Sequence, residues 1–271
     1  MKIKNIIFQL ALSVLVSLSF TSCKKSDRDR DTDLSAAKDN ALTENVVAGI
    51  FKTIGEFTDS TWQLRSSTCA AVSITPADTF TFPKTLTIDF DTINCLCSDG
   101  NLRRGKIIAT FYGKFRDSLT VISVAVQNFA FNNNGIQSGT YSITNKGRNT
   151  AGLLTFGVNI ENAYVYTSMG SIGFSGRYVY QWMTGETTTT NPFDDVYSIT
   201  GSSSGRSISG NTFTSSIVNP LTIALNCAYI EKGMFSIIPA NLSARKVDFG
   251  AGNCDQSATI TINGVNYDFN Q

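Results

Sequence analysis

The sequence predicts a mainly β protein. We expect a long antiparallel meander that forms a curled sheet, an open barrel or a sandwich, with one N-terminal amphipathic helix packed on it. The first observation behind this prediction is that runs of β-branched and aromatic residues, separated by Gly and Asn turn formers, fill most of the chain after Cys69. The second is that no helical pattern interrupts these runs, so successive strands are expected to be antiparallel neighbours.

The N-terminus has the pattern of a cleaved secretory signal over residues 1–22. Lys2 and Lys4 precede an apolar run, Ile6–Phe20, and small residues then lead to Cys23. This ending resembles the bacterial lipoprotein signal, in which the cysteine is acylated, although an aromatic residue stands where that family prefers an aliphatic one. The run is shorter than the roughly 20 residues of a transmembrane helix. We therefore expect a lipid anchor at Cys23 and a location at the outer membrane, on the cell surface or the periplasmic face.

A polar tether is predicted over residues 23–33, where charges alternate and apolar residues are missing. Asp27, Asp29 and Asp31 resemble the acidic signal that directs some Bacteroidetes lipoproteins to the cell surface. Lysine and arginine residues interrupt this signal.

A helix is predicted over residues 34–57. Aliphatic residues recur there every four positions, at Leu42, Val46, Ile50 and Ile54. Thr32 or Asp33 can cap its start. The polar side lacks the Lys/Arg enrichment of membrane-surface helices, so we expect this helix to pack on the sheet.

Five apolar runs are the clearest predicted strands: Lys106–Tyr112, Leu119–Phe131, Gly139–Thr144, Leu153–Tyr166 and Arg177–Met183. Turn formers are expected to separate them at 132–135, 145–147, 169–170 and 201–205. Several runs exceed the usual strand length of sandwich proteins, which favours a curled sheet or an open barrel. Residues 34–271 are expected to form a single β-rich domain.

The segments 69–113 and 227–269 form an internal repeat. Each copy has a cysteine, an Asp-Phe pair and an Asn-Cys pair in the same order: Cys69, Asp89–Phe90 and Asn94–Cys95, then Cys227, Asp248–Phe249 and Asn253–Cys254. The spacing predicts disulfides Cys69–Cys95 and Cys227–Cys254, each closing a hairpin and contributing roughly 3–4 kcal/mol. Cys97 is then the odd thiol or the alternative partner of Cys69. A metal site is the alternative, but zinc-type spacing and histidine are both missing.

Two segments, Asp89–Tyr112 and Cys227–Phe269, resemble a group of Bacteroidetes lipoproteins. That group carries a DFGxGxCD-type element near the C-terminus, here DFGAGNCD at 248–255, and an earlier related element before an Arg-x-Gly-Lys strand. The resemblance covers most of residues 30–271 and implies a related fold and origin but no activity. The first copy departs from the pattern at Asp91, where glycine is usual, and at Cys97.

The composition excludes several function classes. Histidine is absent, which rules out Ser-His-Asp and Cys-His catalysis, histidine-ligated zinc or iron, and imidazole switching. The net charge of +1 provides no basic field for nucleic acid. We therefore expect no enzyme, no cofactor, no metal and no nucleic-acid partner, and leave the oligomeric state open.

Acidic residues in the middle of the chain are the candidate catalytic groups. Asp194 and Asp195, with Glu186 and Glu161, could supply a glycosidase pair if two carboxyls lie about 5–9.5 Å apart. Adjacent acids in a loop rich in Thr, Asn and Pro are more commonly turn residues.

A second group of oxygen-bearing side chains, Asp89, Asp91 and Asn94, suggests calcium. The alternating ligands and central glycine of an EF-hand are missing, however. These residues are expected to order the turn that leads to Cys95.

Aromatic residues alternate on two predicted neighbouring strands: Tyr164, Tyr166, Tyr178, Tyr180 and Trp182. They could form a ligand surface that stacks on sugars, or they could be packing pairs inside the protein.

Three tripeptides resemble the Bacteroidetes O-glycosylation signal: Asp59–Thr61, Asp91–Ile93 and Asp117–Leu119.

Together these features predict a lipid-anchored cell-envelope protein with a binding or structural role. Its partners are expected to be the membrane, through acyl chains on Cys23, and a glycan or protein ligand. One alternative is a periplasmic carrier or chaperone for lipid or lipoprotein, which needs an apolar cavity inside the curled sheet. The other alternative is a carbohydrate-active enzyme that uses carboxylates.

Overall fold

Fifteen strands and one α-helix, α2 (Ser35–Phe57), make up the part of the chain that the computed structural model describes, residues 31–58 and 67–271. The strands are β1 (Ala71–Thr75), β2 (Lys84–Asp89), β3 (Cys95–Leu96), β4 (Leu102–Phe111), β5 (Val121–Phe131), β6 (Asn134–Gln137), β7 (Thr140–Arg148), β8 (Leu154–Thr167), β9 (Gly170–Thr184), β10 (Val196–Arg206), β11 (Thr212–Ala224), β12 (Lys232–Pro239), β13 (Arg245–Ala251), β14 (Ser257–Ile262) and β15 (Val265–Asn270). A 3₁₀ turn, η2 (Pro192–Asp194), precedes β10. The predicted signal peptide, Cys23, most of the tether and Asp59–Thr61 lie outside the described residues.

All strands belong to one antiparallel sheet that runs from β1 at one edge to β15 at the other. The order follows the chain, except that the two-residue β3 pairs only with β4, and β7 lies beside β5 and β8. The mainly β meander is therefore confirmed. Because β1 and β15 are opposite edges, the sheet is open and is not a closed barrel.

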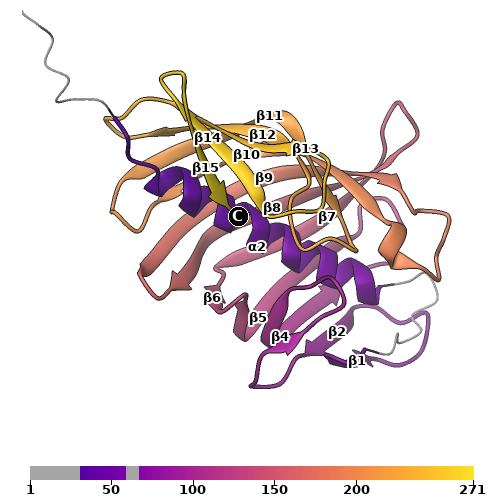
Figure 1. Cartoon of the computed structure of the whole chain (residues 1–271). Coiled ribbons are helices and arrows are strands. Elements are labelled where there is room, and N and C mark those ends of the chain that lie inside the picture. Colours follow the sequence, from indigo (N-terminus) through magenta and orange to yellow (C-terminus); the bar gives the residue numbers. More distant parts are fainter. Residues whose placement is uncertain (1–30, 59–66) are drawn as a thin grey trace, which may run out of the picture. The chain divides into compact units, whose positions relative to one another are not determined.

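Helix α2 lies along one face of this sheet (Figure 1). Of its 23 residues, 19 are buried, and these include Val46, Ile50 and Ile54 from the predicted apolar stripe. Its N-cap residue is Leu34, which makes no side-chain cap hydrogen bond, so neither Thr32 nor Asp33 is the N-cap; Oδ1 of Asp33 accepts a hydrogen bond from Ser35 N at 2.8 Å. The prediction that this helix packs on the sheet is confirmed.

The core between α2 and the sheet is rich in aromatic rings. Phe51 of α2 lies 4.3 Å from the ring of Tyr180 and 5.0 Å from that of Tyr197, measured between centroids. The Phe156 ring lies 5.9 Å from Phe51 and stacks on Phe115. These side chains fill the inner face of the sheet along the middle of the helix.

Two predicted turns lie inside strands, so those predictions were wrong. Residues 201–205 belong to β10 and residues 145–147 belong to β7. Gly201 has φ +147°, and a Cβ at this position would collide with the backbone of β9 at Arg177 and Tyr178. Glycine is needed there for close approach of two strands rather than for chain reversal.

Both predicted disulfides lie at bonding distance, with Cα–Cα separations of 5.5 Å for Cys69–Cys95 and 5.7 Å for Cys227–Cys254. Each joins the open end of a hairpin, β1–β2 in the first copy and β12–β13 in the second. In both copies a third strand, β4 or β14, pairs with the second strand of the hairpin. The repeat in the sequence is thus a repeat in the structure.

The Asp-Phe pairs of the two copies also have equivalent roles. Oδ1 of Asp89 accepts a hydrogen bond from Asp91 N, and Oδ1 of Asp248 accepts one from Gly250 N. The two residues whose N–H groups donate these bonds both have positive φ, +64° for Asp91 and +87° for Gly250. The departure of the first copy from glycine therefore places an aspartate in the left-handed region, which aspartate tolerates better than most residues.

Candidate functional site

The five aromatic residues predicted as one ligand surface lie on opposite faces of the sheet. In β8, Phe156, Val158 and Ile160 point towards α2, and an irregularity in the pairing with β9 follows between Ile160 and Ala163. Asn162 has φ +54° at this bulge. A bulge inserts one extra residue, so the alternation of side chains reverses after it.

The reversal exposes Tyr164 and Tyr166, each 44% accessible, on the face opposite α2, which we call the outer face. Neighbouring strand β9 has no such reversal before its end, so Tyr178, Tyr180 and Trp182 all point inward and are buried. The prediction of a ligand surface was therefore wrong for these three residues. They contact the helix and the core.

A shallow groove crosses the outer face over β8, β9, β10 and β11. It consists of two hollows of about 630 and 470 Å³ that share Asn162, Ser175 and Ser204. We call it the hydroxyl groove, because short hydroxyl side chains line it: Ser171, Ser175, Ser202, Ser204, Thr212, Thr214 and Ser216. Small side chains on adjacent strands leave a trough whose floor is the sheet itself.

Tyr164 lies at one end of the hydroxyl groove, and Tyr166 lies beside it, just beyond that end. Their rings are stacked, with centroids 6.2 Å apart and planes inclined by 23°. Tyr164 pairs across strands with Gly173, and a Cβ on that glycine would lie 3.2 Å from Cε1 of the tyrosine ring. Tyr166 pairs with Gly135 and lines a further hollow of about 480 Å³ over β4–β6. The absence of a side chain at Gly173 lets the Tyr164 ring lie close to the sheet.

Charges at the groove are few and nearly balanced. Arg177 and Glu161 form an exposed ion pair with an N–O distance of 3.7 Å, and Asn159 accepts a hydrogen bond from Nε of Arg177. Arg206 donates to the carbonyl of Gly210 at 3.2 Å. Such a surface suits a neutral or weakly anionic ligand better than a highly charged one.

Below the groove, on the inner face, lies a buried polar cluster around Glu44 of α2. Tyr178 Oη donates to Oε1 of Glu44 at 3.0 Å, and Ser203 Oγ donates to the same oxygen at 3.3 Å. Asn40 links Ser203 to Ser215. Burial raises the pKa of the Glu44 carboxyl to about 7, although its hydrogen bonds act in the opposite direction.

The acidic residues proposed as a glycosidase pair are each engaged in local structure. Glu186 forms an ion pair with Arg148, Asp195 is buried and accepts a hydrogen bond from Nε1 of Trp182 at 3.2 Å, and Thr188 donates to Asp194. Glu161 belongs to the groove. The structure thus holds three of the four carboxylates in the β9–β10 connection, where they order the loop.

The suggested calcium ligands are likewise engaged. Asp89 forms an ion pair with Lys106 at 2.7 Å, and Asn94 accepts a hydrogen bond from Arg104. Lys106 and Arg104 would repel a cation at this position. Elsewhere in the described residues, potential ligand atoms of Cys227, Glu231 and Cys254 lie within 4.8 Å of one another, but both sulfurs belong to a disulfide.

The chain matches no family model, no curated protein and no solved structure. Among the described residues, no helix is long and apolar enough to cross a bilayer.

The hydroxyl groove was missed by the sequence analysis. Its serines and threonines come from three strands, β9, β10 and β11, and two of them, Ser202 and Ser204, lie in a segment that was expected to be a turn. The signal that could have found it is the alternation of small hydroxyl residues with apolar ones in 197–200 and 212–214. This alternation is typical of a half-buried strand with a polar outer face.

Proposed function

We propose that this chain is a lipid-anchored protein of the cell envelope whose outer sheet face binds a glycan. The observation that carries the proposal is the pair of stacked, exposed tyrosines at the end of a groove lined by hydroxyl groups. The proposal of an envelope location rests on the predicted signal peptide and on Cys23.

The chemistry of the groove suits a sugar polymer. Aromatic rings have a negative face that attracts the slightly positive C–H groups of a pyranose ring. Serine, threonine and asparagine side chains both donate and accept hydrogen bonds, as sugar hydroxyls do. The hollows on both sides of the tyrosine pair form an open, extended surface, which fits a chain of sugars better than a compact small molecule.

The alternative functions receive less support. A lipid carrier needs an apolar cavity between helix and sheet, and the space along α2 is occupied by buried side chains such as Phe51, Tyr180 and Tyr197. A carboxylate enzyme needs two free carboxyls that face a common space, and Glu186, Asp194 and Asp195 are all engaged in loop contacts. We therefore favour binding over carriage or catalysis.

The envelope location is tested by metabolic labelling with an alkyne fatty acid. We expect the wild-type chain to incorporate the label, and Cys23→Ser to lose it, because the thiol of that cysteine is the acylated group. Label that persists in Cys23→Ser, or wild-type protein without label, would contradict the lipid anchor. Protease treatment of intact cells then distinguishes a surface location from a periplasmic one.

Binding is tested by titrating soluble polysaccharides against the immobilised chain. We expect Tyr164→Ala to weaken the binding of any glycan by about tenfold or more, since truncating a tyrosine that is a hot spot of binding costs about 2 kcal/mol or more. A Gly173→Val variant should weaken binding as well, because its side chain would displace the Tyr164 ring. Unchanged affinity in both variants would place the ligand elsewhere.

A further inference from the structure

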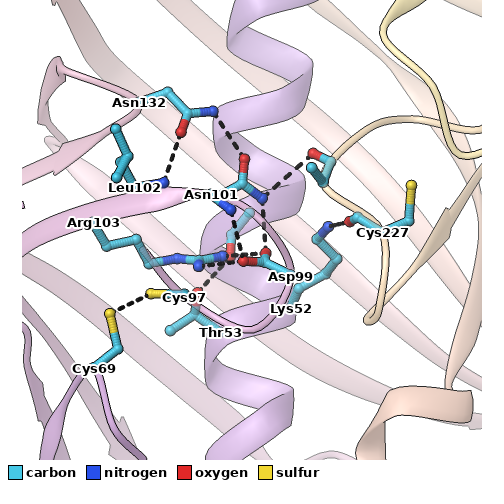
Figure 2. A network of polar contacts seen from close by, with 12 residues as sticks. Lys52, Thr53, Cys69, Cys97, Asp99, Asn101, Leu102, Arg103, Asn132 and Cys227 are labelled. Carbon is cyan, nitrogen blue, oxygen red and sulfur yellow. Dashed lines mark hydrogen bonds and ion pairs between the residues drawn. The ribbon is translucent and has the colours of Figure 1, made fainter. Parts of the chain in front are cut away.

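Three sulfur atoms lie together at the first disulfide. Cys69 is bonded to Cys95, and Sγ of the free Cys97 lies 2.9 Å from Sγ of Cys69 (Figure 2). Thiol–disulfide exchange proceeds by attack of a thiolate on one sulfur of a disulfide. Cys97 is therefore already next to a sulfur with which it could exchange.

The local backbone explains why two cysteines of one loop meet the same partner. Side chains alternate along extended chain, so residues two apart lie on the same side. Cys95 and Leu96 pair with Arg103 and Leu102 of β4, and the extended chain continues to Cys97, whose N–H donates to Asn101 O at 2.9 Å. Leu96, 67% exposed, points the other way.

The charged groups near Cys97 are Arg103, Asp99 and Glu56. Burial raises the pKa of the Cys97 thiol, whereas the Arg103 guanidinium, which interacts with the sulfur, lowers it, and the two carboxylates raise it further. Arg103 is itself fixed by two hydrogen bonds to Asp99, of 2.7 and 2.6 Å (Figure 2). A hollow of about 230 Å³ is lined by both Cys69 and Cys97.

The second copy of the repeat provides an internal comparison. Its disulfide, Cys227–Cys254, closes an equivalent hairpin, but the residue two positions after Cys254 is Gln256. The extra thiol is thus specific to the first copy. Nothing in the hairpin geometry requires a cysteine there.

We propose that Cys69 exchanges its disulfide partner between Cys95 and Cys97. The Cys97 thiol loses its proton to solvent, its Sγ bonds to Sγ of Cys69, and the Cys69–Cys95 bond breaks. Cys95 leaves as a thiolate and takes up a proton. One disulfide and one thiol are present before and after the exchange, so no external oxidant or reductant is consumed.

The exchange is tested on the whole chain, purified without reductant from an oxidising compartment. The protein is incubated at about pH 8.5, near the pKa of a free cysteine, to increase the thiolate fraction, then acidified and labelled with N-ethylmaleimide. The disulfides are then reduced and labelled with a heavier isotopic form of the reagent. Fragment ions that separate Cys95 from Cys97 show which of the two carried the free thiol.

We expect the first label on Cys97 in some molecules and on Cys95 in others, and no first label on Cys227 or Cys254. First label on Cys97 alone would overturn the proposal. Two variants provide an independent check. Cys95→Ser should contain a Cys69–Cys97 disulfide, as the matched Cys97→Ser should contain Cys69–Cys95, and neither variant should have a free thiol among the cysteines after Cys23. Free thiols at both Cys69 and Cys97 in folded Cys95→Ser protein, with native circular dichroism, would also overturn it.

Discussion

Replacing Asp99 by alanine is expected to lower the free energy of unfolding by about 3–5 kcal/mol, because it leaves a buried guanidinium without its counter-charge. Arg103 and Asp99 are both buried, and their two hydrogen bonds join the guanidinium to both carboxylate oxygens. Burial alone would raise the pKa of the Asp99 carboxyl, but Arg103 outweighs this and holds the pKa below its ordinary value. Denaturant unfolding measures the loss.

The location of this ion pair explains why the effect should be large. Asn101 donates to Asp99 and to the carbonyl of Ala228, and Lys52 of α2 donates to the carbonyl of Cys227 (Figure 2). The pair therefore lies where the two disulfide elements meet at the helix. Burial lowers the pKa of Lys52 to about 8, which is further evidence of a poorly solvated environment.

Two controls accompany the Asp99 variant. Arg177→Ala breaks an exposed ion pair and should cost at most about 1 kcal/mol. The double variant Asp99→Ala/Arg103→Leu removes both charges and should recover much of the loss, because no unpaired charge remains. Stability of Asp99→Ala within 1 kcal/mol of wild type would mean that the ion pair contributes little.

Glu44→Gln is expected to raise the free energy of unfolding at neutral pH by about 3 kcal/mol. It should also remove the pH dependence of stability that Glu44 causes. The pKa of Glu44 is about 7 in the folded protein and near 4.5 in the unfolded chain, so the folded state binds the proton more tightly. The stabilising contribution of the protonated Glu44 carboxyl to folding is fully present below pH 4.5 and is lost as the pH rises to about 7. At 1.36 kcal/mol per pKa unit, the loss amounts to about 3 kcal/mol.

The amide keeps the oxygen that accepts the hydrogen bonds of Tyr178 and Ser203, so the geometry of the cluster is preserved. Unfolding of wild type and variant is compared at the two ends of this pH range. The free energies of unfolding of wild type and Glu44→Gln should be nearly equal at the acidic end and diverge towards neutrality. Glu161→Gln, on the outer face, should have the same pH profile as wild type. Parallel pH profiles for Glu44→Gln and wild type would show that Glu44 is already stabilised as an anion.

The features that sequence reasoning predicted well are those set by local periodicity. The four-residue repeat of aliphatic side chains placed the helix at 34–57, and the structure has it at Ser35–Phe57. The repeated cysteine and Asp-Phe spacing placed the disulfides, because a hairpin brings the residues before its first strand next to those after its second.

The features that were missed depend on strand register. The bulge at Asn162 decides that Tyr164 points outward while Tyr178 on the adjacent strand points inward, and no local pattern in the sequence specifies that bulge. Gly201 looks like a turn residue but serves close strand approach. The hydroxyl groove combines side chains from four strands, so it becomes visible only when their pairing is known.

The most direct test of glycan binding by the outer face is to measure binding of the whole chain to an array of bacterial and host glycans. Wild type is compared with the double variant Tyr164→Ala/Tyr166→Ala and with Tyr112→Ala, which removes a 59% exposed tyrosine that does not line the hydroxyl groove. We expect at least one class of glycan to be retained by wild type and by Tyr112→Ala and lost by the double variant. Equal retention by all three proteins, or no retention by wild type, would contradict a glycan-binding outer face.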